Sequence, residues 1–309
     1  MRHTILGIDS SLSKSLATEL LTDSHNLVRI VNHHEYWIPG TETLPLDLTS
    51  VEEIRKAITG SDIVYLFASH IPMDRHMQEN WIRIVKASIK ACKWTNSKFI
   101  YVDNADIYGR FNGRITENTP CRPCTDSGKV LLDAALLVEH ELPGQTFKCI
   151  ICRTADIYGP YTNSANYLRY NVIERILRNK VPRWFINDEM QHSFTFTTDI
   201  ARAIRMLVMN EDSNNQIWHL PTENSLSGQT LIHIVSNIVG SDPYYTVLSG
   251  ASLWMEALLN KEVSVNYNRA YRFENGIIFD SSKFNSAFSY KPVSYYDGMK
   301  LTIDYLIEA

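Results

Sequence analysis

The chain lacks the features that mark several large classes of protein. Its five cysteines are an odd number in 309 residues, so they do not form the dense disulfide framework of small secreted proteins. Positive charge is not in excess either, because the chain has 30 basic and 34 acidic side chains and its formal net charge is −4. Binding along a nucleic-acid backbone needs clustered positive charge. We therefore expect no nucleic-acid partner.

Long apolar runs are missing as well. No segment approaches the roughly 18 consecutive apolar residues that a membrane-spanning helix requires. The first nine residues reach a charge too early for a secretory signal peptide. No fixed-period repeat or Gly/Ser/Pro-rich linker interrupts the chain, and 44% of its residues are hydrophobic, which is ample for a core. These observations predict a globular, cytoplasmic protein with no membrane association.

What the chain does have is a regular alternation of apolar runs and helical patterns in its first half. Strands are predicted near residues 4–8, 27–31, 62–68, 98–102 and 146–153, with helices near 12–20, 51–57, 81–94 and 129–142. Such alternation implies crossover connections between parallel strands. The predicted fold is therefore α/β, a doubly wound parallel sheet with helices on both faces.

After about Tyr161 the alternation loosens. Helices are predicted near 167–179, 199–209 and 228–239, and short strands near 193–196 and 216–220. We expect a dinucleotide-binding type of domain over residues 1–165 and a smaller C-terminal substrate-binding lobe over 166–309, with segments near 190–220 returning to the first domain. The crevice beyond the carboxyl ends of the strands is then the default ligand site.

Two predicted helices carry more apolar residues than one buried face needs. They cover residues 81–92 and 130–138, and a helix of this kind is buried on two sides. Either they lie deep beneath the second lobe, or they form the interface of a homodimer. Both alternatives stay open from the pattern alone, and with the family pattern discussed below we expect a homodimer.

The cysteines include two Cys-x-x-Cys pairs, Cys121 with Cys124 and Cys149 with Cys152, which is the spacing of zinc sites. The second pair lies in a predicted strand, where residues three apart point to opposite faces and cannot hold one ion. We therefore expect no metal site. The first pair precedes a helix, so a redox role is an alternative to thiols without function.

A collinear series of motifs runs through most of the chain. It comprises Gly7-Ile8-Asp9-Ser10-Ser11-Leu12-Ser13, Asp47-Leu48, the segment 62–69, Asp106-Ile107-Tyr108-Gly109, Lys129 with Asp133, the segment 153–160, and the segment 198–203. In order and spacing this series resembles the extended short-chain dehydrogenase/reductase superfamily, in its NAD-dependent epimerase/dehydratase branch. The resemblance implies a Rossmann-like fold, a nicotinamide dinucleotide cofactor, and an oxidoreductase acting on a small carbonyl, hydroxyl or nucleotide-sugar compound.

The glycine loop of the family, Gly-x-x-Gly-x-x-Gly, matches here as Gly7, Ser10 and Ser13. The second glycine lets the backbone approach the pyrophosphate and the third allows close helix–strand packing. A serine at the second position adds a side chain where phosphate passes, although the helix N-terminus still attracts anions. An ordinary capped turn with nothing bound is the alternative. The resemblance implies these cofactor-binding residues: Gly7, Ser10, Ser11, Leu12, Ser13, Asn32, His33, Asp47, Leu48, Phe67, Ala68, Ser69 and Lys129.

The end of the second predicted strand influences the choice of cofactor. An NAD-selective site places Asp or Glu there to bind the ribose hydroxyls. This chain has Asn32-His33-His34 instead, so no carboxylate repels the 2′-phosphate of NADP. The prediction is NADP or NAD with a tilt toward NADP, and the alternative that both histidines are solvated loop residues stays open.

The catalytic positions depart from the family pattern. Members use a Ser or Thr four residues before the Tyr of the Tyr-Gly pair, and a Tyr-x-x-x-Lys motif whose tyrosine exchanges a proton during hydride transfer. Here Asn104 holds the first position, and anchoring on Lys129 puts Thr125 in the tyrosine position. A threonine hydroxyl is far too basic to replace a phenol. We therefore expect an atypical member without the usual acid–base tyrosine.

Three alternatives follow from this departure. Another side chain could act as acid or base, and the candidates are Tyr108, Asp103, Asp156 and Cys124. A water-relayed proton steered by Lys129 and Asn104 is the second alternative. The third is a protein that binds nucleotide without turnover, as a sensor, and a scaffold without nucleotide is its limiting case. The candidate catalytic residues are Lys129, Asn104, Thr125 and Tyr108.

The resemblance also implies a substrate group. Epimerases that act on nucleotide sugars use an arginine just before the strand that precedes Asp199, and here His192 stands in that position. A second arginine that binds the diphosphate matches Arg269, with Arg272 as its neighbour. One contact is thus lost and one is ambiguous, so the substrate class stays open. The predicted substrate-binding residues are His70, Asp156, His192, Arg269 and Arg272.

Overall fold

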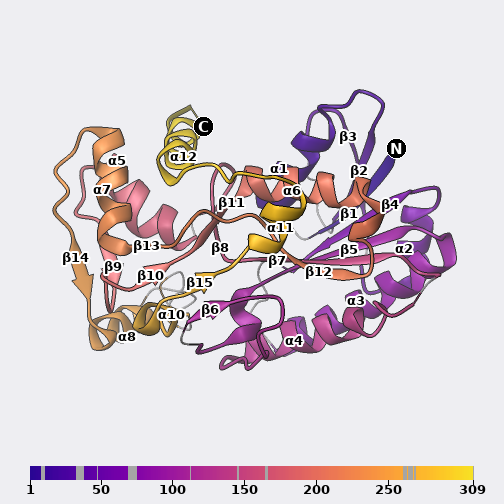
Figure 1. Ribbon diagram of the computed structural model, residues 1–309, viewed down its shortest axis with the longest axis horizontal. Coiled ribbons are helices and arrows are strands. Elements are labelled where there is room, and N and C mark those ends of the chain that lie inside the picture. Colours follow the sequence, from indigo (N-terminus) through magenta and orange to yellow (C-terminus); the bar gives the residue numbers. More distant parts are fainter. Residues whose placement is uncertain are drawn as a thin grey trace. The chain divides into compact units, whose positions relative to one another are not determined.

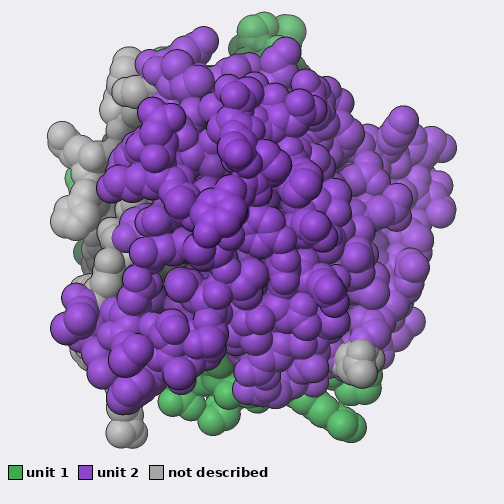
Figure 2. Space-filling view, turned by 90° about the vertical axis from the view of Figure 1, so that its left-hand side faces the viewer, with its two compact units in different colours: residues 1–109, 120–154, 200–220 green, residues 110–119, 155–199, 221–309 purple. Residues whose placement is uncertain are grey.

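The computed structural model describes residues 1–7, 11–32, 38–46, 48–68, 75–111, 113–144, 146–163, 166–259, 263, 267 and 269–308. The chain divides into two compact units, coloured separately in Figure 2. Unit 1 comprises residues 1–109, 120–154 and 200–220, and unit 2 comprises residues 110–119, 155–199 and 221–309. The chain therefore crosses from one unit to the other several times.

Unit 1 is built on a seven-stranded sheet in which every neighbouring pair is parallel (Figure 1). The strand order is β12-β7-β5-β4-β1-β2-β3. The strands are β1 (Arg2–Leu6), β2 (Leu27–Asn32), β3 (Thr41–Pro45), β4 (Ile63–Phe67), β5 (Lys98–Asn104), β7 (Cys149–Thr154) and β12 (Gln216–His219). The predicted doubly wound parallel sheet is confirmed, and its order reverses between β1 and β4.

Helices cover both faces of this sheet, as Figure 1 shows: α2, α3 and α4 on one side, α1 and α6 on the other. Their bounds are α1 (Ser11–Leu20), α2 (Val51–Ile58), α3 (Arg75–Thr95), α4 (Asp126–Glu139) and α6 (Thr197–Met209). Strands β4 and β7 are buried along their whole length, as expected for central strands covered on both faces. The predicted apolar stripe of α1, formed by Leu12, Leu16 and Leu20, is buried against the sheet.

Some boundaries differ from the sequence predictions for local reasons. Helix α4 begins at Asp126, three residues before the predicted start, because Thr125 caps it with a hydrogen bond to the Gly128 N–H. Strand β3 escaped prediction because it is a half-exposed edge strand whose residues alternate between polar and apolar only weakly. The helix predicted near 167–179 is a π-helical turn, Arg169–Ile173, followed by the short α5, Glu174–Leu177.

Unit 2 has short strands, mostly paired in twos, and several helices. The strands are β6 (Arg114–Ile115), β8 (Asp156–Tyr158), β9 (Arg183–Phe185), β10 (Gln191–His192), β11 (Phe194–Phe196), β13 (Leu226–Ser227), β14 (Thr246–Leu248) and β15 (Ile278–Phe279). The helices besides α5 are α7 (Gly228–Val239), α8 (Gly250–Leu259), α10 (Arg272–Asn275), α11 (Ser282–Ala287) and α12 (Tyr295–Glu308). None of the helices that the structure describes, in either unit, combines the length and apolarity needed to cross a membrane.

The core of unit 2 is rich in aromatic side chains around Trp184, which is fully buried. Tyr167 and Phe273 meet the indole ring edge to face, with ring centroids 5.4 Å away in both cases. Helix α7 starts against the same ring, and a Cβ at Gly228 would overlap the indole. Only glycine fits there, so the start of α7 is fixed by the position of Trp184.

Candidate cofactor and substrate sites

Gly7, which follows β1, packs closely against Ser13 of α1. Gly7 donates its N–H to the Val31 carbonyl at 3.2 Å, and a Cβ at Gly7 would lie 3.0 Å from Ser13 Oγ. The buried Ser13 therefore fills the space beneath Gly7, at the third position of the glycine loop. Helix α1 begins at the half-buried Ser11 and carries no acidic residue in its first turn. This geometry fits a pyrophosphate at the helix N-terminus.

The other predicted cofactor residues fall into two groups. Leu12, Leu48 and Phe67 are core side chains, at most 4% exposed. Ala68 follows β4 directly and donates its N–H to the Val102 carbonyl at 2.7 Å, so its backbone lies at the carboxyl edge of the sheet. Five predicted residues lie outside the described part of the chain: Ser10, His33, Asp47, Ser69 and His70. The side chain of Asn32 also lies outside it.

Asn104 ends β5 at the same carboxyl edge. Its Oδ1 accepts a hydrogen bond from the Asp106 N–H at 2.9 Å, and its Nδ2 donates to the Ala68 carbonyl at 3.5 Å. The amide thus caps the 3₁₀ turn Ala105–Tyr108 and links the ends of β4 and β5. The amide supplies the acceptor for one of these contacts and the donor for the other.

Thr125 and Lys129 both belong to the first turn of α4. The Thr125 hydroxyl accepts a hydrogen bond from the Gly128 N–H at 3.0 Å, as a helix cap. The Lys129 ammonium donates to Asp126 Oδ1 at 2.9 Å, and its side chain is 61% exposed. Thr125 therefore stabilises the start of α4, whereas the Lys129 side chain places its ammonium group in an exposed position.

Tyr108 lies in a buried polar network. Arg153 forms two hydrogen bonds with the Asp103 carboxylate, at 2.7 and 2.9 Å, and a third from Nη1 to the Tyr108 oxygen at 3.1 Å. Tyr108 Oη lies 2.7 Å from His219 Nε2. Arg153 can only donate, so the Tyr108 oxygen accepts from it, whereas the direction of the hydrogen bond between Tyr108 and His219 depends on the tautomer of His219. Burial raises the pKa of Tyr108 well above its usual range.

This network was not predicted from the sequence beyond Tyr108 and Asp103. Its partners come from three strands, and Arg153 and His219 are fully buried. The one available signal was a charged residue, Arg153, inside the apolar run of β7. Since Tyr108 is fully buried and hydrogen bonded to both Arg153 and His219, the network serves the fold of unit 1 better than it serves proton transfer to a ligand.

The buried and half-buried thiols have environments that favour their protonated form. Burial raises the pKa of the half-buried Cys121 thiol, and it raises that of Cys149 to about 12. Cys152 is fully buried beside Cys149 on β7, and Cys124 is exposed. In the part of the chain that the structure describes, no three His, Cys, Asp or Glu side chains are placed to hold a metal ion.

Three predicted substrate residues meet in unit 2. The guanidinium of Arg272 forms an ion pair with the Asp156 carboxylate; the Arg272 side chain is 1% exposed and that of Asp156 is 29% exposed. His192 is buried against Phe273, with ring centroids 4.9 Å apart. Burial lowers the pKa of His192 to about 4, with Asp156 acting against this shift and Arg272 with it. Arg269 is half-buried, and its backbone carbonyl accepts a hydrogen bond from the backbone N–H of Arg272 at 3.1 Å.

The sequence comparison with protein families decides the relationship. The model of the NAD dependent epimerase/dehydratase family matches residues 4–220. The chain belongs to this family. The resemblance inferred from the motifs is thereby confirmed, and the match takes in all seven strands of the sheet of unit 1 except the first two residues of β1.

Relatives of this epimerase/dehydratase family member share its fold at low sequence identity. An uncharacterized UDP-glucose epimerase, YtcB of Bacillus subtilis (strain 168), is 22% identical over 212 residues, 66% of this chain and just under two thirds of the relative (64%). The structure of UDP-glucuronic acid 4-epimerase from Bacillus cereus in complex with NAD superposes with a TM-score of 0.82 at 18% identity, covering 100% of this chain and 99% of the other. A dTDP-glucose 4,6-dehydratase from Streptomyces venezuelae with NAD bound gives 0.80 at 17%, covering 100% and 97%. These likenesses show the fold.

Proposed function

We propose that this epimerase/dehydratase family member is an NAD(P)-dependent oxidoreductase. When bound, the dinucleotide would supply the nicotinamide that takes or gives a hydride at a carbonyl or hydroxyl carbon. The observation that carries the proposal is the turn after β1, where Gly7 packs closely over Ser13 at the start of α1. Support comes from relatives of the same fold, since the Bacillus cereus epimerase and the Streptomyces venezuelae dehydratase were crystallised with NAD.

The chain needs a proton route that does not use a tyrosine in the family position. Thr125 is occupied as a helix cap, and Tyr108 is fully buried and hydrogen bonded to His219. Lys129 keeps an exposed ammonium, and Asn104 fixes the carboxyl edge of β4 and β5. We therefore favour the water-relayed route, in which Lys129 holds the cofactor ribose and steers a water, with Asn104 holding the local backbone.

The choice of cofactor follows the sequence at the end of β2, where Asn32-His33-His34 offers no carboxylate to repel a 2′-phosphate. We propose NADP as the preferred dinucleotide, with NAD as the alternative. Titration with NADPH and NADH, followed by energy transfer from the tryptophans to the nicotinamide, tests this directly. We expect saturation at micromolar concentration with NADPH binding more tightly, and Gly7→Val should abolish it. Absence of binding up to millimolar concentration would exclude the oxidoreductase function.

A dinucleotide sensor without turnover is the second candidate function. It is favoured by the structural contacts of two residues: Thr125 caps α4, and Tyr108 is hydrogen bonded to His219. Neither position therefore presents a phenol to solvent. Lys129→Ala separates the two functions once a substrate is in hand. An enzyme should lose turnover while the variant still folds, whereas a sensor shows no turnover in either form. The buried free thiols Cys92, Cys149 and Cys152 suit the reducing, cytoplasmic setting that we expect.

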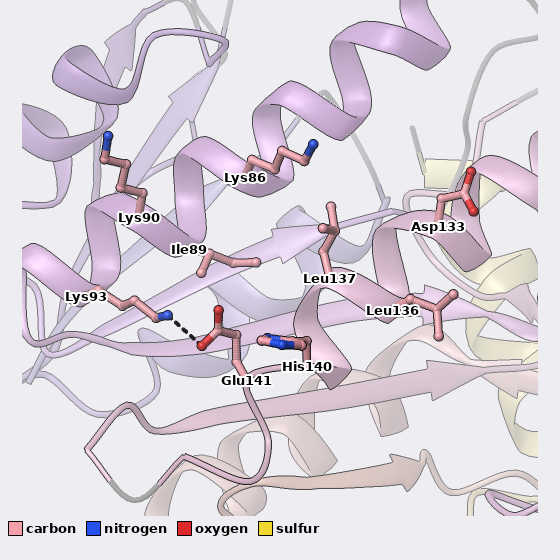
Figure 3. A pocket seen from close by; sticks show the side chains of 9 residues that line it. All are labelled: Lys86, Ile89, Lys90, Lys93, Asp133, Leu136, Leu137, His140 and Glu141. Carbon is pink, nitrogen blue, oxygen red and sulfur yellow. Dashed lines mark ion pairs between the residues drawn. The ribbon is translucent and has the colours of Figure 1, made fainter.

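We also propose that the chain forms a homodimer through the groove between α3 and α4 (Figure 3). The groove has a volume of about 520 Å³ and lies wholly in unit 1. Its lining residues are Lys86, Ile89, Lys90, Lys93, Asp133, Leu136, Leu137, His140 and Glu141. Leu136 lines this groove and is 50% exposed, so it offers apolar surface that a second copy would bury.

Charge complementarity favours a second copy as the occupant. Helix α3 lines the groove with three lysines and α4 lines it with Asp133, and Glu141, just beyond the end of α4, pairs with Lys93 at 2.6 Å (Figure 3). A two-fold axis would bring the lysine row of one copy toward Asp133 of the other and bury Leu136 from both. Light scattering after size exclusion should give a dimer, and Leu136→Glu should give a monomer. Leu301→Glu, at another exposed leucine on α12, is the control and should stay dimeric.

A further inference from the structure

We propose that the substrate group of unit 2 selects a compound without a diphosphate, a neutral polyhydroxy carbonyl compound or alcohol rather than a nucleotide sugar. The inference rests on the proposed function and specifies the substrate class of the same site. It starts from the charges around Asp156, Arg272 and His192, which the sequence analysis grouped as substrate-binding residues. In the structure these three side chains form a cluster with no net positive charge.

A diphosphate is recognised by cations that are free to point at its oxygens, most often by the planar fork of arginine. Arg272 instead donates from Nη1 to the Asp156 carboxylate, and the arginine side chain is 1% exposed, so its guanidinium is not presented to solvent. Asp156 is part of the same fold, so its carboxylate is present at a far higher effective concentration than any dissolved phosphate. A nucleoside diphosphate would have to displace it from a guanidinium that is almost fully buried.

The second position that could supply a cation does not do so. His192 is 2% exposed and packs among aromatic rings, with the centroid of Trp184 at 5.7 Å and that of Phe273 at 4.9 Å. With its pKa lowered to about 4 by this burial, the imidazole is neutral at pH 7. It therefore adds no attraction for an anion.

The remaining arginines of unit 2 are largely neutralised by carboxylates. Such pairs join Arg110 with Glu274, Arg114 with Asp280, Arg169 and Arg178 with Glu174, and Arg183 with Glu256. Arg269, the half-buried neighbour of the Arg272 pair, is the other predicted diphosphate contact. A single arginine beside a neutral pair is a weak site for a dianion.

Hydroxyl groups suit this cluster better. A carboxylate has about four lone-pair sites, and the Asp156 side chain is 29% exposed, so it can accept from a ligand hydroxyl while it holds Arg272. No charge has to be displaced for such contacts. The cluster thus matches the hydroxyls of an unphosphorylated sugar or related polyol.

Calorimetric titration of the whole chain with UDP and with UDP-glucose tests the inference. We expect no saturable binding of either compound up to millimolar concentration. Asp156→Asn keeps the shape but leaves the charge of Arg272 available, and UDP binding should then strengthen about tenfold to a hundredfold. Glu174→Gln is the matched control, because it releases Arg169 and Arg178 elsewhere in unit 2 and should leave UDP binding unchanged. The double variant Asp156→Asn/Arg272→Met should lose the gain.

Two results would overturn the inference. One is micromolar binding of UDP or UDP-glucose by the unchanged protein, a titration that needs no variant to fold. The other is a folded Asp156→Asn protein, checked by circular dichroism, that gains no affinity for UDP. The NADPH titration on the same preparation keeps the two proposals apart, since failed dinucleotide binding refutes the oxidoreductase function whatever UDP does.

Discussion

The buried pair of Asp103 and Arg153 allows a stability prediction with a magnitude. The two side chains are 0% and 1% exposed and share two hydrogen bonds, at 2.7 and 2.9 Å. Asp103→Asn removes the negative charge and leaves the guanidinium in the core of unit 1. Breaking a buried pair in this way costs about 3–5 kcal/mol, because the remaining charge is desolvated without compensation.

The surroundings of Arg153 place the expected loss at the lower end of that range. Nη1 keeps its hydrogen bond to Tyr108 at 3.1 Å, and Nη2 lies 3.6 Å from the partly exposed Glu139 carboxylate. We therefore expect Asp103→Asn to lower the free energy of unfolding by about 3 kcal/mol. Urea denaturation followed by circular dichroism and by tryptophan fluorescence measures this, and coincidence of the two probes checks that one transition is being followed.

A matched control and a rescue complete the experiment. Glu42→Gln breaks the ion pair with Arg29, in which Glu42 is 57% exposed. Because solvent screens such a pair, the variant should lower the free energy of unfolding by no more than about 1 kcal/mol. Replacing both core partners, as Asp103→Leu/Arg153→Met, should recover most of the stability. The reasoning is refuted if Asp103→Asn costs no more than Glu42→Gln, or if the double replacement is worse than the single one.

The remaining predictions concern a cap, a glycine and a histidine. Thr125→Ala should lower unfolding free energy by about 1 kcal/mol in urea denaturation, while Thr125→Ser should not, because only the capping oxygen matters. Gly228→Ala should cost about 1–3 kcal/mol in the same assay and perturb the fluorescence of Trp184, which its methyl group would overlap. His192 has a folded pKa near 4, below the usual 6.5, so the unfolded chain binds the extra proton and stability should fall by about 3 kcal/mol from pH 7 to pH 4. His192→Gln should flatten that part of the pH profile, and an unchanged profile would contradict the assignment.

The fold was predictable from the sequence because its signal is local and repeated. Apolar runs and helical stripes such as that of α1 depend on near neighbours, and their alternation is enough to predict a parallel sheet. Strand β3 shows the limit of this signal. As a half-exposed edge strand it buries too little on either face to leave a clear apolar pattern.

The polar contacts were not predictable in the same way, because their partners are far apart in the chain. Arg153 and Asp103 are 50 positions apart, Tyr108 and His219 are 111 apart, and Arg272 and Asp156 are 116 apart. Parallel strands and crossovers bring them together only once the fold exists. From its resemblance to a family, the sequence could predict that Asp156 and Arg272 belong to one group, but not that Asp156 pairs with Arg272.

Two residues that depart from the family's catalytic pattern make structural contacts in this protein. Asn104 caps a 3₁₀ turn and links two strand ends, and Thr125 caps α4, so both positions hold side chains that the local backbone requires. The capping contacts of these residues do not distinguish a protein without catalytic activity from one that uses other residues for catalysis. The exposed ammonium of Lys129 is different, because its pairing with Asp126 lies in solvent and is worth little to the fold. If Lys129→Ala leaves stability unchanged but weakens dinucleotide binding, the cation serves the cofactor, and the enzyme and the sensor remain the two functions to separate by turnover.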